Sequence, residues 1–103
     1  MTDFGLTPEA QKLITDIFKR HPRVERVEVF GSRAMGNYED SSDIDLVLWG
    51  EVDARLQGEI MLELDELPLP YTFDVKVYHT INHQPLKEHI DKYAKLLYKR
   101  SDI

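Results

Sequence analysis

The sequence contains no cysteine, which excludes disulfide frameworks, thiolate metal sites and cysteine nucleophiles. It also lacks long apolar runs. The longest, Leu46 to Trp49, is far short of the roughly 18 residues that a membrane span needs. No basic start followed by an apolar stretch indicates a secretion signal. We therefore expect a soluble cytoplasmic protein with no membrane partner.

Positive charge is also scarce. The 103 residues include 13 Lys and Arg against 19 Asp and Glu, for a net charge of -6. Nonspecific nucleic-acid binding depends on many basic side chains that neutralise phosphates, so that function is not expected. A hydrophobic content of 42% argues against disorder. The length predicts a single domain over residues 1–103.

Hydrophobic periodicity predicts alternating helices and strands in the order αβαβαβα. The predicted elements are a helix capped by Thr7 and ending before His21-Pro22, a strand over 26–30, a helical turn over 32–36, a strand over 44–49, a helix over 56–67, a strand over 72–78, and a C-terminal helix whose apolar face includes Leu86, Ile90, Tyr93, Ala94 and Leu97 and whose last turns include Lys95, Lys99 and Arg100. The apolar run in the second strand predicts a central strand that is buried on both faces.

Acidic side chains mark the start of the second strand. Asp43 and Asp45 are two residues apart, so in an extended chain they point to the same side. Such a pair resists joint ionisation unless a cation lies between the carboxylates, and Mg²⁺ prefers these oxygen ligands. Asp74 lies on the polar face of the third strand. If that strand is beside the second, three carboxylates meet, and they could hold two metal ions for in-line displacement at phosphorus.

A glycine-serine turn follows the first strand. Gly31 lets the backbone approach a ligand closely, and the Ser32 hydroxyl can donate a hydrogen bond to a phosphate oxygen. Arg33 is expected either to contact phosphate or to form a surface ion pair. Lys76 shares the face of Asp74, where it either touches the site or acts as a counter-charge for the acids. Together these residues fit a triphosphate with Mg²⁺.

Competing motifs are incomplete. Gly31 and Gly36 have the spacing of a P-loop, but Asn37-Tyr38 stands where that motif requires Lys and Ser or Thr. The aspartate pair could begin a calcium loop, yet Val47 and Leu48 occupy the positions of a third ligand and the glycine. The four histidines have no ligand spacing on any one element. None of these alternatives accounts for the pattern.

The string GSRAMGNY…SDIDL, with LPYTFDVKVY downstream, resembles the minimal nucleotidyltransferases (MNT proteins) of the DNA polymerase β-like nucleotidyltransferase superfamily. The resemblance implies an α/β (α+β) fold with a small mixed three-stranded sheet flanked by helices. It also implies a separately encoded helical partner of the HEPN or substrate-binding type, toward which an MNT protein acts as antitoxin.

The resemblance further assigns roles to individual residues. Asp43 and Asp45 would bind both Mg²⁺ ions, and Asp74 would bind the catalytic ion and accept the proton of the attacking hydroxyl. Gly31 and Ser32 would contact the triphosphate of ATP or another nucleoside triphosphate. The implied activity is transfer of a nucleoside monophosphate, expected to be AMP from ATP, to a hydroxyl on the helical partner. Two alternatives stay open: a small-molecule acceptor such as an amino alcohol, and a non-catalytic binding antitoxin.

Overall fold

A computed structural model describes residues 4–101. They form a mixed sheet with strand order β3-β2-β1-β4, in which β1 pairs antiparallel with both β2 and β4, and β2 pairs parallel with β3. The elements are α1 (Pro8–Lys19), β1 (Val24–Phe30), α2 (Ser32–Met35), β2 (Ile44–Gly50), α3 (Ala54–Asp65), β3 (Phe73–Val77), the 3₁₀ turn η1 (Tyr78–Thr80), α4 (Gln84–Tyr93) and β4 (Lys95–Lys99). The mixed sheet flanked by helices is confirmed, but the sheet has four strands where three were expected.

The C-terminal helix was predicted too long. Helix α4 ends at Tyr93, and Ala94 is extended with φ -63° and ψ 143°. The chain then returns along β1 as β4, with Glu28 paired to Leu96. Strand β4 covers what would otherwise be an open edge of β1, and Tyr98 stacks on Phe18 of α1 with ring centroids 6.1 Å apart. Because this pairing satisfies backbone groups of β1 that a longer helix would leave unpaired, tertiary structure overrides the helical spacing.

Local signals at the helix ends are confirmed. The Thr7 hydroxyl accepts a hydrogen bond from Ala10 N over 3.1 Å, and Pro8 is the first helical residue of α1. The short helix α2 ends at Gly36, whose φ of 84° lies in the left-handed region. The Thr7 cap fixes where α1 begins, and the left-handed glycine fixes where α2 ends.

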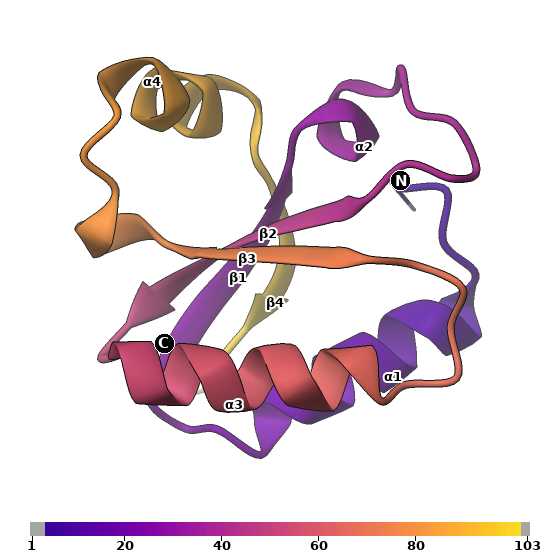
Figure 1. The fold of residues 1–103 in the computed structure, drawn as a ribbon, viewed down its shortest axis with the longest axis horizontal. Coiled ribbons are helices and arrows are strands. Elements are labelled where there is room, and N and C mark those ends of the chain that lie inside the picture. Colours follow the sequence, from indigo (N-terminus) through magenta and orange to yellow (C-terminus); the bar gives the residue numbers. More distant parts are fainter. Residues whose placement is uncertain (1–3, 102–103) are drawn as a thin grey trace.

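Helices cover the two faces of the sheet unequally (Figure 1). Helices α1 and α3 lie together against one face, where they enclose the main core. Helix α4 lies on the opposite face, where Ile90 packs with Phe30 and Val47 in a smaller cluster. Val47 and Leu48 are fully buried, which confirms β2 as a central strand. Within residues 4–101 no helix is long and apolar enough to cross a membrane.

Candidate active site

Two aspartates meet on neighbouring strands of the sheet. Asp45 of β2 is the register partner of Asp74 of β3, and parallel neighbours are about 4.8 Å apart. Both side chains are half-buried, whereas Phe73 and Val75 on the other face of β3 are buried. The condition that β3 lies beside β2 is therefore met, and Asp74 lies on the same side of the sheet as Asp45.

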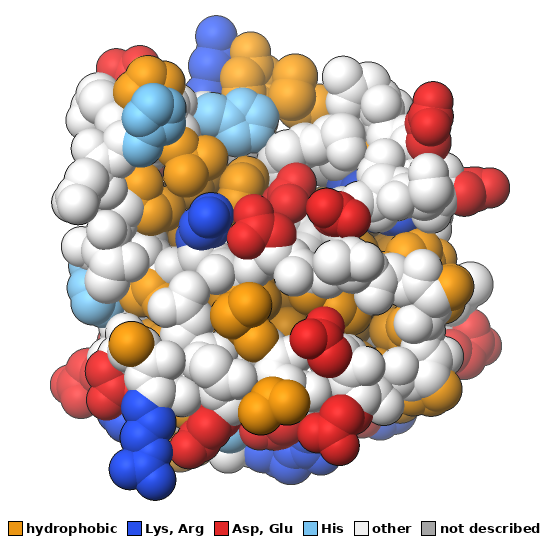
Figure 2. All heavy atoms as spheres, in the orientation of Figure 1, with side chains coloured by type: hydrophobic (Ala, Val, Ile, Leu, Met, Phe, Trp, Pro, Cys, Tyr) orange, Lys and Arg blue, Asp and Glu red, His pale blue; other side chains and the backbone are white. Residues whose placement is uncertain are grey.

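The neighbouring acids affect the ionisation of Asp45. The pKa of Asp45 is raised to about 6, first by burial and then by the neighbouring charges of Asp74 and Asp43. Lys76 opposes this shift, and its Nζ lies 3.7 Å from Asp74 Oδ1. Figure 2 shows acidic side chains gathered across the middle of this face, with a basic side chain beside them. Asp43 is exposed just before β2.

The glycine-serine turn lies against the side chain of Asp45. Gly31 has φ 73° and ψ -153°, a conformation that is practically restricted to glycine. A Cβ atom built on Gly31 would overlap Asp45 Oδ2. Only a residue without a side chain therefore lets the carboxylate lie against the backbone of the turn. This contact brings Gly31 and Asp45 together, while the roles of Ser32 and Asp43 stay predictions.

Replacing Gly31 by alanine should destabilise the protein by about 2–3 kcal/mol, because it combines a positive φ with a steric overlap. Gly36 is a matched control, since its φ is 84° but nothing lies within 4 Å of an added Cβ. Gly36→Ala should cost only about 1 kcal/mol. Denaturant unfolding of both variants measures the difference. Equal losses would show that Asp45 does not restrict the turn.

Arg33 is placed differently from the prediction. Only 2% of it is exposed. Its guanidinium donates to the carbonyl oxygens of Phe4 over 2.8 Å and Ser42 over 2.9 Å, and more weakly to that of Asp40. It also lies over the ring of Tyr71 at 4.9 Å. Because its donors are used on backbone carbonyls, Arg33 is neither a phosphate contact nor a surface ion pair. It holds the loop that leads into β2.

Sequence reasoning missed His89. Its Nε2 accepts a hydrogen bond from Gly31 N over 3.0 Å, across 58 residues of sequence. Spacing along the chain has no signal for this contact, because it depends on how α4 packs over the end of β1. The histidine therefore belongs to the surroundings of the turn and to no cluster of histidines.

Asp43, Asp45 and Asp74 offer the type of ligand atom that a hard divalent cation prefers. Carboxylate oxygens are the preferred ligands of Mg²⁺, and a cation beside Asp45 would relieve the repulsion that raises the pKa of its carboxyl. Within residues 4–101 no group of three acidic or histidine side chains is already arranged to bind a metal ion. Lys76 is in contact with Asp74 instead. The residues thus fit the ion in the kind of ligand that they offer.

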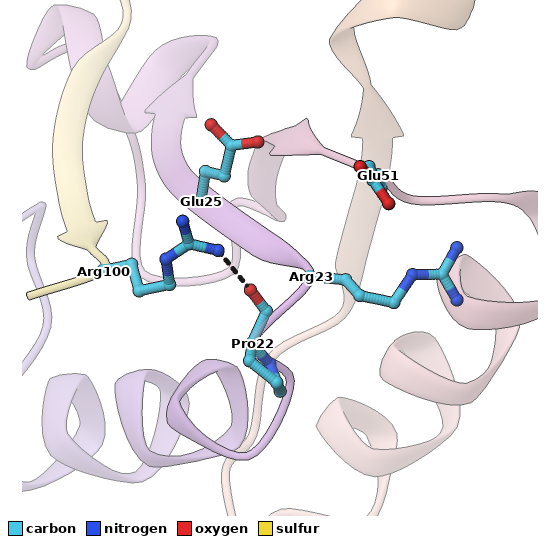
Figure 3. Close-up of a pocket in the computed structure, with 5 residues that line it drawn as sticks. All are labelled: Pro22, Arg23, Glu25, Glu51 and Arg100. Atoms are coloured by element: carbon cyan, nitrogen blue, oxygen red, sulfur yellow. Dashed lines mark hydrogen bonds between the residues drawn. The ribbon is translucent and has the colours of Figure 1, made fainter. Parts of the chain in front are cut away.

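A cavity of about 270 Å³ lies elsewhere, where β1 begins and β2 has ended (Figure 3). Its lining includes Arg23, Glu25 and Glu51, and Arg100 donates to the carbonyl oxygen of Pro22 over 2.6 Å. This cavity is at the end of the sheet away from the candidate active site, because the other end of β1 pairs with Asp45 of β2. The cavity is therefore separate from the candidate active site.

A match to a known protein family identifies the family of this chain. The family described as "Polymerase beta, Nucleotidyltransferase" matches residues 12–103. The chain belongs to this family. The nucleotidyltransferase activity that the resemblance implied is thereby supported. No curated protein matches the chain.

Solved structures share the fold of this nucleotidyltransferase. One is a toxin-antitoxin with AMP-PNP, at 19% identity and a TM-score of 0.72, covering 89% of this chain and 75% of the other. Another is the toxin-antitoxin MntA-HepT, at 16% identity and a TM-score of 0.67, covering 93% and 75%. A third is a tri-AMPylated Shewanella oneidensis HEPN toxin in complex with MNT antitoxin, at 16% identity and a TM-score of 0.66, covering 91% and 73%. These similarities establish the mixed sheet and its flanking helices as the fold.

Proposed function

We propose that this nucleotidyltransferase transfers AMP from ATP to a hydroxyl on a helical HEPN-type protein partner, with Mg²⁺, and that it acts as the antitoxin of the pair. The observation that carries the proposal is the register pairing of Asp45 with Asp74 directly beside the Gly31 turn. Family membership supports the reaction class. The choice of AMP and of a HEPN partner draws on the structural relatives, one with AMP-PNP and one with an AMPylated HEPN toxin.

In the proposed reaction the acceptor oxygen forms a bond to the α-phosphorus of ATP, and the bond to the pyrophosphate leaving group breaks. Asp74 accepts the hydroxyl proton. Its half-buried carboxyl is well placed for this role because it lies on the same face of the sheet as Asp45. Asp43, Asp45 and Asp74 would hold two Mg²⁺ ions, which supply charge stabilisation to the attacking and leaving oxygens. The Ser32 hydroxyl and amide donate to the phosphates, and Gly31 allows their close approach.

Lys76 has a defined place in this proposal. In the free protein its ammonium partly neutralises the acids through Asp74. Cations that bind between the carboxylates would compete with this contact. Lys76 is then free to turn toward the leaving phosphates, where a compact positive charge favours departure.

The proposal is tested by the mass of the co-purified helical partner before and after incubation with MgCl₂ and ATP. We expect one or more AMP additions, and the Asp43→Asn/Asp45→Asn double variant should abolish them. The matched control is Glu39→Gln/Asp40→Asn, two exposed acids of the preceding loop, which should leave the additions unchanged. A double variant that modifies the partner as well as wild type does would refute the assignment.

The same proteins separate the two alternatives. Tight binding of a small amino alcohol by the isolated chain, with no change in partner mass, would favour a small-molecule acceptor. Full rescue from toxicity by the Asp43→Asn/Asp45→Asn variant would favour an antitoxin that acts by covering its partner. Neither alternative has a specific contact in residues 4–101 that supports it.

A further inference from the structure

The contact between Gly31 and His89 joins two distant parts of the chain at the nucleotide site. Gly31 N donates to His89 Nε2 over 3.0 Å, a good length for a nitrogen-to-nitrogen hydrogen bond. Gly31 follows β1 directly, and His89 lies in the last half of α4. The hydrogen bond therefore connects the backbone of the turn to a helix that no family motif in the sequence includes.

The imidazole of His89 is itself held in place. Its ring meets the ring of Phe30 edge-on at 6.2 Å and lies 5.3 Å from the ring of Tyr93. The next residue, Ile90, is 2% exposed and anchors α4 in the smaller cluster on this face. The ring contacts and the anchored helix restrain the imidazole, so the turn is bonded to an acceptor that the packing of α4 holds in place.

The direction of the hydrogen bond defines the chemical state of the imidazole. An imidazole nitrogen that accepts has no proton, so the neutral ring has its proton on Nδ1. The Nε2 lone pair of His89 is committed to Gly31 and is unavailable as a metal ligand or as a base at that atom. The role open to His89 is therefore to position the turn.

The turn needs such an anchor because its glycine is intrinsically flexible. Gly31 adopts φ 73° and ψ -153°, and an unrestrained glycine samples many other conformations. Asp45 packs against one side of the turn and His89 bonds to its amide. With the amide restrained, the neighbouring Ser32 is presented in one orientation before any phosphate arrives, which reduces the ordering cost of binding.

We propose that His89 is a positioning residue of the nucleotide site: it fixes the Gly31 turn by accepting its amide hydrogen, and it keeps this bond when the triphosphate is bound. The inference rests on the proposed function, because it assumes that phosphates meet the turn at Ser32. It excludes a competing arrangement in which the phosphate takes the Gly31 amide and displaces the imidazole.

The experiment uses the full chain, MgCl₂ and AMP-PNP. The imido link of this analogue replaces only the β–γ bridge, so the acceptor protein is left out to keep the α–β bond intact during the measurement. Calorimetry should show that His89→Ala binds the analogue about three- to tenfold more weakly, as expected for loss of one hydrogen bond. His89→Gln, whose side-chain oxygen can occupy the position of Nε2, should recover most of the affinity. The control is His83→Ala, an exposed position before α4 whose side chain does not cap the helix, and it should bind like wild type.

A nuclear magnetic resonance measurement on the wild-type protein needs no variant. A coupling between the Gly31 and His89 nitrogens across the hydrogen bond should be present in the free protein and persist with AMP-PNP bound. Disappearance of the coupling on binding, or equal or tighter binding by His89→Ala, would overturn the inference while leaving the proposed function intact. No binding by the wild-type protein would refute the proposed function, and the inference with it.

Discussion

Replacing Asp45 by asparagine is expected to stabilise the fold and to abolish nucleotide transfer at the same time. Burial and two like charges raise the pKa of Asp45 to about 6, so the folded state binds the proton more tightly than the unfolded chain does. The free energy of unfolding therefore falls as pH rises from about 4 to about 6. Asparagine is neutral at every pH, so it avoids this loss.

The expected gain is about 1–2 kcal/mol at about pH 8, after allowance for solvent screening of a half-buried group. It should vanish below about pH 3, where the carboxyl is protonated in both states. Transfer should fall about 10³-fold or more, because a carboxylate of the proposed metal site is lost. Denaturant unfolding at both pH values and a transfer assay measure the two effects.

Glu39→Gln is the control, since it removes an exposed acid near the site and should change neither quantity. Magnesium chloride provides a second comparison. It should stabilise wild type but leave Asp45→Asn unaffected, because the cation would relieve the repulsion that asparagine has already removed. A variant that is less stable than wild type at about pH 8 would contradict burial and like-charge repulsion as the origin of the raised pKa.

Replacing Arg33 by alanine is expected to produce the largest loss of stability, about 3–5 kcal/mol. The guanidinium is buried and bonds to the carbonyl oxygens of Phe4, Asp40 and Ser42. Truncation leaves these acceptors without their donor and opens a void under Tyr71. The loop before β2 should become more mobile, and Asp43 at the end of this loop should no longer be held in one position.

Arg33→Lys separates charge from geometry, because an ammonium cannot reproduce the planar fork that reaches several carbonyls. It should recover only part of the loss. Arg55→Ala is the matched control, since that side chain is 89% exposed on α3 and its removal should leave the unfolding midpoint nearly unchanged. Chemical denaturation measures all three variants. An Arg33→Ala protein as stable as Arg55→Ala would contradict the structural role.

Local signals in the sequence were sufficient for much of the fold. The cap of Thr7, the left-handed glycine after α2 and the apolar run of β2 each have their cause within a few neighbouring residues. The C-terminal segment did not, because Leu96 and Leu97 fit a helical face and a strand equally well. The choice between them depends on β1, about 70 residues earlier in the chain, whose edge accepts β4.

The same distinction applies to the site. The aspartate pair and the glycine-serine turn are local patterns, and Asp74 required only one assumption about which strands are neighbours. Arg33 was misassigned because its environment comes from the rings of Tyr38 and Tyr71, which the sequence does not place beside it. His89 was missed for a similar reason, since only packing of α4 brings it to the turn.

The position of β4 has a consequence for synthesis of the chain on the ribosome. Strand β1 emerges about 70 residues before its outer neighbour β4 does. During that interval the valines of β1 lie on an exposed edge that can template pairing with another nascent chain. The lysines at both ends of β4 place charge on the sheet's outer border once it docks, which discourages further strand addition and fibril growth.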